Sequence, residues 1–404
     1  MNRMLNAGLI AMGLYLAAPQ GAQAEVEQAD FAACIDRIAH QAQAEGISTR
    51  IVDQKLRPAR HIDRVIELDR RQPEFTTPFH DYLNRRVNEQ RIRQGRQLLE
   101  EHGELLQSVA RQYGVPAQYL VAFWGLETNY GSFFGRMPVI DSLATLACDL
   151  RRSDYFTGEL LAALRILDEG AIDLERMEGS WAGAMGHVQF MPSVFLRYAV
   201  DHDGSGRRDL WGSIPDAMAS AANFLSHIGW ETGYRWGREV SLPEDFDFQL
   251  AGGDRRKSLA EWSRLGVRRG DGAPLPPVDI EAALLLPAGH RGPAFLVYDN
   301  FNVIMRWNRS EYYALSVGIL ADRIAGASGL HNPPPEDVPR LSRDQVQDLQ
   351  ARLREEGHDP GPVDGILGPA TRRAIRSFQS EQGLVADGFP DPAVLDALDV
   401  STSS

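Results

Sequence analysis

An apolar stretch in the first half of the chain, residues 114–131 (GVPAQYLVAFWGLETNYG), constrains the fold most strongly. Pro116 is typical of the first turn of a helix, and a glycine closes the stretch, where helices commonly end. Phe123 and Trp124 lie four and three residues before Glu127, so a helix brings all three to one apolar face. The stretch therefore predicts a helix that carries a carboxyl group on its core-facing side.

The position of Glu127 is unusual for a glutamate. Removal from water disfavours its charged form, and so does the nearby helix C-terminus, so we expect the pKa of Glu127 to be raised. A glutamic acid that holds its proton near neutral pH can serve as a general acid. The alternative is a glutamate paired with one of the neighbouring arginines.

The segment at residues 179–192, GSWAGAMGHVQFMP, places Ser180 and Gln189 among glycines and alanines. Small residues allow the backbone to approach a ligand closely, which suits a groove for an extended sugar chain. Tight helix packing uses the same composition, so the segment alone leaves both readings open.

A second polar segment, residues 306–313, places an amide among aromatic residues. In RWNRSEYY, Asn308 is flanked by Trp307 and Tyr313. An amide between aromatic faces is suited to hold pyranose rings, and an aromatic core cluster is the alternative.

Together these segments resemble the B-type lytic murein transglycosylases in their soluble form. WGLETNYG, GSWAGAMGHVQFMPSVF, a DxDxSG loop and RWNRSEYY occur in the family's order. The resemblance implies a mainly α fold, with a lysozyme-like α-helical catalytic core over residues 25–326, and it makes Glu127 the catalytic residue. Short β-prone runs separated by turn residues predict a small β-rich insertion at about residues 237–303. The substrate-binding residues that the resemblance implies are Ser180, Gln189, Asn308, Tyr313, Trp307, Tyr82 and Tyr155.

The chain departs from the family pattern at two positions. Trp307 stands where a tyrosine is usual, and Phe224 also replaces an expected tyrosine and so lacks its hydroxyl. These departures concern the details of sugar binding rather than the reaction.

The reaction that the resemblance implies is the non-hydrolytic cleavage of the β-1,4 bond between N-acetylmuramic acid and N-acetylglucosamine in peptidoglycan. Glu127 would protonate the leaving oxygen and then accept the proton of the C6 hydroxyl, which closes a 1,6-anhydro ring. No cofactor is needed for this chemistry. One rival is a hydrolytic muramidase with a second acid, Asp141 or Asp154. The other is a non-catalytic wall-binding scaffold, which would have no use for a buried acid.

The composition of residues 327–398 predicts a linker followed by a separate module. Residues 327–340 contain three consecutive prolines in a polar setting, which is typical of a semi-rigid linker that permits independent motion. Residues 341–398 predict three helices, the first with a capping box at Ser342 and Gln345. Through VDGILGPATRRAIRSFQSEQGL this segment resembles the peptidoglycan-binding modules of wall hydrolases. A helical cap on the main domain is the alternative.

The first residues resemble an export signal. A basic residue, a short apolar stretch and Ala22-Gln23-Ala24 predict a signal peptide at residues 1–24 and a periplasmic protein with no transmembrane anchor. The net charge of −13 argues against nucleic acid as a partner, so glycan strands of peptidoglycan are the expected partner, bound by a monomer. The two cysteines, Cys34 and Cys148, can pair in an oxidising compartment or lie buried as free thiols.

The DxDxSG loop follows the first half of a calcium-binding loop. Its twelfth position is Gly212 rather than glutamate, and the next suitable acid is Asp216. A solvated turn is therefore one reading. The family resemblance includes a longer loop that Asp216 closes, which implies a structural calcium ion. The ligands would be Asp201, Asp203, Ser205, Arg207 and Asp216.

Overall fold

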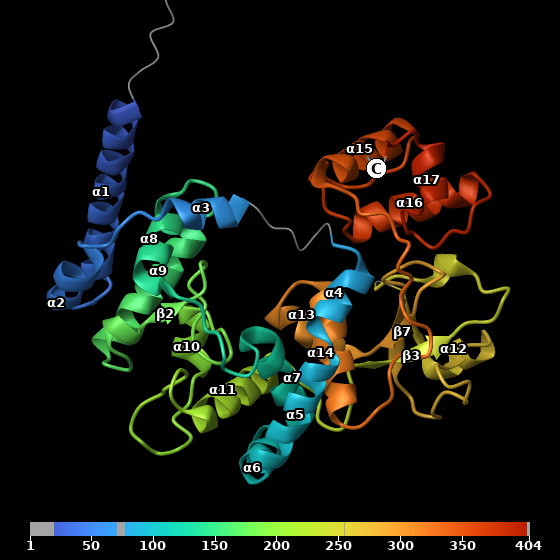
Figure 1. Ribbon diagram of the computed structural model, residues 1–404, viewed down its shortest axis with the longest axis horizontal. Helices are drawn as coiled ribbons and strands as arrows, with labels where there is room; N and C mark the ends of the chain where they lie inside the picture. The colour runs from blue at the N-terminus through green and yellow to red at the C-terminus, as the bar shows by residue number, and fades with distance from the viewer. Residues whose placement is uncertain (1–19, 71–76, 254, 402–404) are drawn as a thin grey trace, which may run out of the picture.

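The structure, a computed structural model, describes residues 20–70, 77–253 and 255–401, with the backbone alone at residues 20–29. Most of the predicted signal peptide therefore lies outside the described residues. Seventeen α-helices and seven short strands form within these ranges, which confirms the mainly α-helical fold class (Figure 1). None of the helices in these ranges combines the length and the apolar character needed to cross a membrane.

The helices form two groups on either side of the segment that follows α7. One group is centred on the pair α8 and α9, and its members are α1 (Gln20–Ala44), α2 (Thr49–Ile51), α3 (Asp63–Arg70), α8 (Val139–Cys148), α9 (Ser153–Asp168) and α10 (Pro192–Tyr198). The central group consists of α4 (Phe79–Arg86), α5 (Glu89–Glu101), α6 (Gly103–Tyr113), α7 (Ala117–Thr128), α11 (Ile214–His227), α13 (Asp299–Trp307) and α14 (Glu311–Ile324). Short turns of other helix types cover Val52–Leu56, Leu174–Arg176 and Phe248–Leu250.

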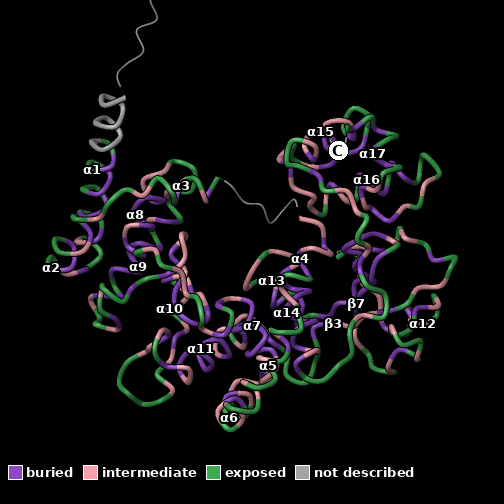
Figure 2. Tube along the Cα trace, viewed as in Figure 1, coloured by how far each residue is buried: buried purple, intermediate pink, exposed green. Residues whose placement is uncertain are grey.

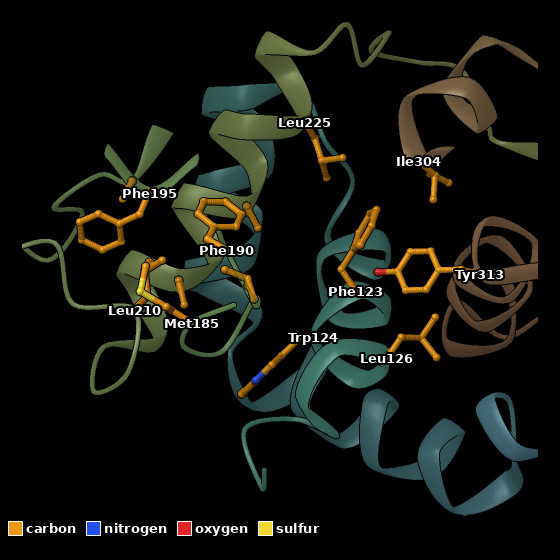
Figure 3. Close-up of a cluster of buried hydrophobic side chains, with 14 of the residues drawn as sticks. Phe123, Trp124, Leu126, Met185, Phe190, Phe195, Leu210, Leu225, Ile304 and Tyr313 are labelled. Atoms are coloured by element: carbon orange, nitrogen blue, oxygen red, sulfur yellow. The ribbon is translucent and has the colours of Figure 1, made fainter. Parts of the chain in front are cut away.

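Helix α7 lies at the centre of the core (Figures 2 and 3). Every residue of α7 from Tyr119 to Leu126 is buried, whereas the sequence predicted burial of one face. The reason is that α5, α6, α11 and α14 all pack against it, and a helix surrounded in this way is apolar all round. The helix ends at Asn129 and Tyr130, whose φ angles of 48° and 60° turn the backbone into the left-handed region. Glu127 thus sits in the last turn.

A five-stranded antiparallel sheet forms the predicted β-rich region. Its strands, in spatial order, are β4 (Arg256–Ser258), β6 (Glu281–Leu285), β7 (Ala294–Val297), β3 (Gly237–Ser241) and β5 (Arg268–Arg269). One face packs with α12 (Leu259–Arg264) around the fully buried Trp262. A separate two-stranded sheet joins β1 (Met137–Pro138) to β2 (Glu178–Gly179) and fixes the start of the segment that holds Ser180.

The C-terminal module contains α15 (Arg343–Glu355), α16 (Pro369–Glu381) and α17 (Pro392–Ala397) around a small core of its own. The predicted capping box of Ser342 and Gln345 is present.

The linker before this module is attached to the main domain, which differs from the independent motion that its prolines suggested. The carboxylate of Glu239 accepts hydrogen bonds from the backbone N–H groups of His331 and Asn332, both at 2.8 Å. Arg291 forms an ion pair with Asp337 at 2.7 Å. Polar contacts that the proline run cannot reveal therefore hold the linker against the sheet.

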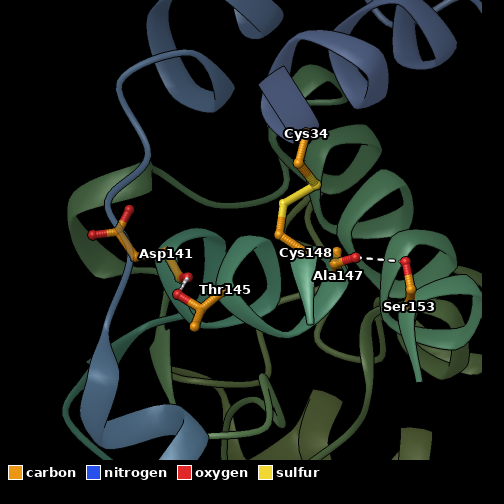
Figure 4. Close-up of a disulfide and its surroundings, with 6 residues drawn as sticks. All are labelled: Cys34, Asp141, Thr145, Ala147, Cys148 and Ser153. Atoms are coloured by element: carbon orange, nitrogen blue, oxygen red, sulfur yellow. Dashed lines mark hydrogen bonds between the residues drawn. A yellow bond between two sulfur atoms is a disulfide. The ribbon is translucent and has the colours of Figure 1, made fainter. Parts of the chain in front are cut away.

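Cys34 of α1 and Cys148 of α8 form a disulfide bond across 114 positions of the chain (Figure 4). Beside it, Ser153 donates a hydrogen bond to the carbonyl of Ala147 at 2.6 Å, and Thr145 donates to the carbonyl of Asp141 at 2.8 Å. The bond joins the first helix to the centre of its helical group.

We predict that the double variant Cys34→Ala, Cys148→Ala loses about 2–5 kcal/mol of stability, because the disulfide closes a long loop in the unfolded chain. Urea unfolding measures this loss. Reductant should lower the stability of the wild type to that of the variant and leave the variant unchanged. Equal urea midpoints for oxidised wild type and variant would contradict a stabilising role.

Candidate active site

Glu127 lies half-buried in the last turn of α7, with its carboxylate held by two aromatic donors. The indole N–H of Trp307 donates a hydrogen bond to Glu127 Oε1 at 2.9 Å, and the hydroxyl of Tyr313 donates a short hydrogen bond to the same oxygen. The donors come from α13 and α14, 180 and 186 positions later in the chain. The acid is therefore fixed in orientation by side chains that the fold brings from far away.

Tyr313 is suited to remain a donor. Its side chain is buried, and this burial together with the neighbouring Glu127 carboxylate raises the pKa of Tyr313 well above its usual value. The phenol therefore keeps its proton across the physiological pH range. Figure 3 shows its hydroxyl pointing towards α7.

The two departures from the family pattern, Trp307 and Phe224, contact one another. Their ring centroids lie 5.3 Å apart, and the Trp307 ring also packs on Phe123 at 4.4 Å and on Phe190 at 5.5 Å. An indole can donate from its N–H but cannot accept a hydrogen bond there or ionise near neutral pH. Trp307 therefore provides a constant donor, and the apolar Phe224 packs against its larger ring.

A second network, which sequence reasoning missed, holds the end of α7 to the segment that carries Gln189. Thr128 donates to the backbone carbonyl of His187 at 2.9 Å, and the indole of Trp124 donates to His187 Nδ1 at 2.9 Å. Burial lowers the pKa of His187 to about 4, so its ring is neutral at pH 7 and Nδ1 can accept. The one signal for this network in the sequence is the polar residue Thr128 directly after Glu127.

Ser180 and Gln189 lie in two successive tight turns, which span residues 180–184 and 185–190. Ser180 Oγ accepts hydrogen bonds from the N–H groups of Ala182 and Ala184 at 3.3 and 3.0 Å. A Cβ on Gly179 would lie 2.2 Å from the carbonyl oxygen of Ala184, so glycine is required there. The small residues here thus allow close packing within the chain itself, and a groove for a sugar chain stays a prediction.

Gln189 has a φ of 50°, which is uncommon for a residue with a side chain. Its amide nitrogen donates to the carbonyls of Phe134 at 3.1 Å and Gly186 at 3.0 Å. These bonds fix the side chain and direct its donors into the protein, which leaves the amide oxygen as the group suited to meet a ligand.

The other predicted sugar-binding residues lie on three different helices or helix ends. Asn308 is the residue that ends α13, directly after Trp307. Tyr82 of α4 is buried, with its ring 5.8 Å from that of Tyr312. Tyr155 is half exposed on α9, where its ring contacts Phe156 of the same helix. The roles of Asn308, Tyr82 and Tyr155 in substrate binding stay predictions.

The two acids considered as a second catalytic carboxylate lie on α8 and α9. Asp141 on α8 accepts hydrogen bonds from the backbone and side chain of Arg60, at 3.3 and 3.2 Å. Asp154 is exposed in the first turn of α9. Both lie in the helical group that contains the disulfide, while Glu127 belongs to the central group.

The acidic loop brings together the three carboxylates that the calcium hypothesis requires. Asp201, Asp203 and Asp216 place ligand oxygens within 4.8 Å of one another. Asp216 is fully buried, and its oxygens accept hydrogen bonds from three backbone N–H groups of the loop, those of His202, Asp203 and Asp209.

The hydroxyl groups of Ser205 and Ser213 also form hydrogen bonds within the acidic loop. Hydrogen bonds from Ser213 and Ser205 lower the pKa of Asp203, so its carboxylate is charged at neutral pH. Ser205 Oγ donates to the carbonyl oxygen of Arg207 at 3.3 Å, so these two oxygens lie close together. The chemistry of these donors fits a hard cation such as calcium. Asp216, rather than residue 212, contributes the third carboxylate of this cluster.

Comparisons with known proteins agree with this architecture. Residues 30–322 match the family described as Transglycosylase SLT domain, and residues 342–398 match a family of peptidoglycan binding domains. Membrane-bound lytic murein transglycosylase B of Escherichia coli is 31% identical over 250 residues, which are 60% of this chain and 66% of that protein. That match thus spans just under two thirds of the curated relative.

Solved structures extend the similarity to nearly the whole chain. SltB3 from Pseudomonas aeruginosa, in complex with NAG-anhNAM-pentapeptide, is 49% identical with a TM-score of 0.87, and the match covers 91% of this chain and 99% of that one. Slt35 of Escherichia coli in complex with calcium is 29% identical with a TM-score of 0.61, covering 73% and 92% of the two chains. The chain therefore belongs to the transglycosylase SLT domain family and is a lytic murein transglycosylase with a C-terminal peptidoglycan-binding domain.

Proposed function

We propose that this chain cleaves the β-1,4 bond between N-acetylmuramic acid and N-acetylglucosamine and forms 1,6-anhydromuramic ends, with Glu127 as the single acid and base. The observation that carries the proposal is the carboxylate of Glu127, positioned by Trp307 and Tyr313 at the end of the central helix. The complex of SltB3 with an anhydro sugar supports the same product here.

The reaction proceeds in two proton transfers through one carboxyl group. Glu127 first donates its proton to the glycosidic oxygen, and the bond from that oxygen to C1 of muramic acid breaks. The N-acetyl group of the same sugar stabilises the positive charge at C1. Glu127, now a carboxylate, removes the proton of the C6 hydroxyl, whose oxygen bonds to C1. The acid is regenerated and no water is consumed.

The two aromatic donors give the two carboxyl oxygens of Glu127 different roles. Both donate to Oε1, so this oxygen acts as an acceptor throughout, and Oε2 carries the proton that moves to and from the substrate. A fixed acceptor also prevents the carboxyl group from rotating between the two transfers. Trp307 and Tyr313 are thus positioning residues for the acid.

Sugar binding is assigned to polar groups around this acid. The oxygen of the Gln189 side-chain amide accepts from a sugar N–H or hydroxyl, and Asn308 binds from the end of α13. Ser180 shapes its turn through its two accepted hydrogen bonds and offers its hydroxyl to the sugar. Tyr82 and Tyr155 are the further residues to which we assign sugar binding.

A hydrolytic mechanism is less well supported than the proposed one. It requires a second carboxylate to activate water or to bond to C1. Arg60 holds Asp141, and Asp154 is exposed on another helical group. A non-catalytic scaffold is also less well supported, because it gives no reason for an acid that two aromatic donors hold in place.

We further propose that the loop of Asp201, Asp203 and Asp216 holds a structural calcium ion, with Ser205 and the Arg207 carbonyl as further ligands. The complex of Slt35 with calcium supports this assignment. The ion would order the loop and take no part in the chemistry. Export to the periplasm by residues 1–24 is proposed from the sequence and from the substrate.

We predict that Glu127→Gln lowers murein cleavage by at least about 10²-fold, because the amide can neither donate nor accept the catalytic proton. Release of soluble fragments from sacculi measures the rate. The matched control is Glu104→Gln, an exposed acid on α6, which should keep full activity. Near-normal turnover in the Glu127 variant would remove this residue from the mechanism.

Tyr313→Phe should lower kcat by about tenfold, the effect of losing one hydrogen bond to a charged group. The ring remains, so the fold should survive. The neighbouring Tyr312→Phe loses a hydroxyl that donates to the carbonyl of Pro287 at 3.2 Å and interacts with Arg372 rather than with Glu127, and it should keep its kcat. An equal effect of both substitutions would argue against a special role for the Tyr313 hydroxyl.

Calcium should stabilise the folded chain, because an ion that binds only the native state adds RT ln(1 + [L]/Kd), about 2.7 kcal/mol at a hundredfold excess over Kd. Thermal unfolding after chelation should show a Tm that rises by several degrees on addition of calcium and by less with magnesium. Asp203→Asn should reduce the shift, while Asp245→Asn, an exposed acid outside the loop, should not. Identical melting curves with calcium and chelator would show that the loop is only a turn.

A further inference from the structure

Arg86, the last residue of α4, is half-buried beside the end of α7. Its guanidinium donates a long hydrogen bond, 3.5 Å, to the carbonyl oxygen of Leu126, the residue that precedes Glu127. The helix does not continue to this carbonyl, because the N–H of Tyr130 bonds to the carbonyl of Trp124 instead. Arg86 therefore places a positive charge at the negative end of the α7 dipole.

The same guanidinium lies within electrostatic range of the Tyr313 hydroxyl. Burial and the Glu127 carboxylate raise the pKa of Tyr313, and the charge of Arg86 opposes this rise. Helix α4 packs against α14, which carries Tyr313 (Figure 1). The Tyr313 hydroxyl is bonded to Glu127 Oε1, and Leu126 precedes Glu127 in α7. Both contacts of Arg86 are thus with immediate neighbours of the catalytic carboxyl group.

Further contacts hold Arg86 in this position. Its Cζ atom lies 5.4 Å from the centre of the Tyr82 ring, a distance that allows a cation–π interaction. Arg91 of α5 donates to the backbone carbonyls of Arg85, at 3.1 Å, and of Arg86. The guanidinium of Arg91 also donates to Asn129 Oδ1 at 3.2 Å, which ties the end of α4 to the residue that follows α7. Backbone and side chain of Arg86 are therefore fixed relative to the end of α7.

The titratable and charged groups that face the end of α7 come from α4, α5 and α14 and from two loops. They are Tyr82 and Arg86 of α4, Arg91 of α5, His102 between α5 and α6, Tyr313 of α14, and His187. His187 is neutral at pH 7, and Tyr313 keeps its proton. Arg91 directs its guanidinium at backbone carbonyls and at the amide of Asn129. Arg86 is thus the cation that borders the hydroxyl on the catalytic carboxyl group.

We propose that Arg86 is a positioning residue of the reaction, whose guanidinium stabilises the Glu127 carboxylate that remains after the first proton transfer. The inference rests on the proposed function and assigns a part in it to a residue outside the sugar-binding set. Glu127 must act first as an acid and then as a base, so neither of its two forms can be strongly favoured. Burial and the end of the α7 dipole favour the acid, and a nearby cation favours the carboxylate. Arg86 balances the two forms.

The test is the pH dependence of kcat for murein cleavage by Arg86→Met, which removes the charge and keeps much of the length of the side chain. Wild-type activity should fall as the pH rises through the pKa of Glu127, because the acid form starts the reaction. Removal of a cation raises the pKa of a neighbouring carboxyl group, so the alkaline limb should move to higher pH by at least about one unit. At the optimum kcat should fall about tenfold, the factor that corresponds to one pKa unit, with KM unchanged.

Two substitutions separate the charge of Arg86 from its packing. Arg86→Lys keeps a positive charge and should keep the alkaline limb at the wild-type pH. Arg85→Met changes the exposed arginine next to it and should leave both the limb and kcat unchanged. Thermal unfolding shows whether each variant is folded. Arg86→Gln, which can still donate to the carbonyl of Leu126, replaces the methionine variant in the comparison where methionine prevents folding.

An alkaline limb at the same pH in the wild type and in the uncharged variant would overturn the proposal. An equal shift in Arg86→Lys would also overturn it, because the effect would then not follow the charge. Failure of the proposed function would appear differently, as murein cleavage that survives Glu127→Gln.

Discussion

The hydrogen bonds from Trp307 and Tyr313 to one oxygen of Glu127 are the interaction on which the rest of the structure depends. They join the end of α7 to two helices almost two hundred positions later, so the site exists only when the central helical group is assembled. Because Tyr313 keeps its proton and an indole cannot ionise near neutral pH, both donors persist across the working pH range. The position of the catalytic proton then follows from the fold.

Contacts in the rest of the molecule hold Glu127 and its two donors in place. Burial of α7 by α5, α6, α11 and α14 fixes the helix that presents the acid. Thr128 and Trp124 attach it to His187, and so to the turn that carries Gln189. The sheet and the attached linker place the C-terminal module next to the α13–α14 junction.

Local signals in the sequence predicted much of this structure. The capping box at Ser342 and the helix over residues 117–128 depend on neighbouring residues, and both form. The family motifs predicted Glu127 as the catalytic residue, and its carboxyl group is held by Trp307 and Tyr313. Contacts between distant segments could not be read in this way. The sequence suggested that Trp307 holds a sugar, whereas its indole N–H is donated to Glu127, and the attachment of the linker to Glu239 depends on a strand ninety positions away.

The nature of the new chain end tests the central claim most directly, because a single acid that uses the sugar's own C6 hydroxyl consumes no water. Peptidoglycan should be digested in water enriched in heavy oxygen, and the released disaccharide peptides analysed by mass spectrometry. The account predicts products lighter by one water than the hydrolysis products, with no heavy oxygen at C1 of muramic acid. Reducing ends that carry the heavy isotope would show that water attacks C1, and would contradict the mechanism.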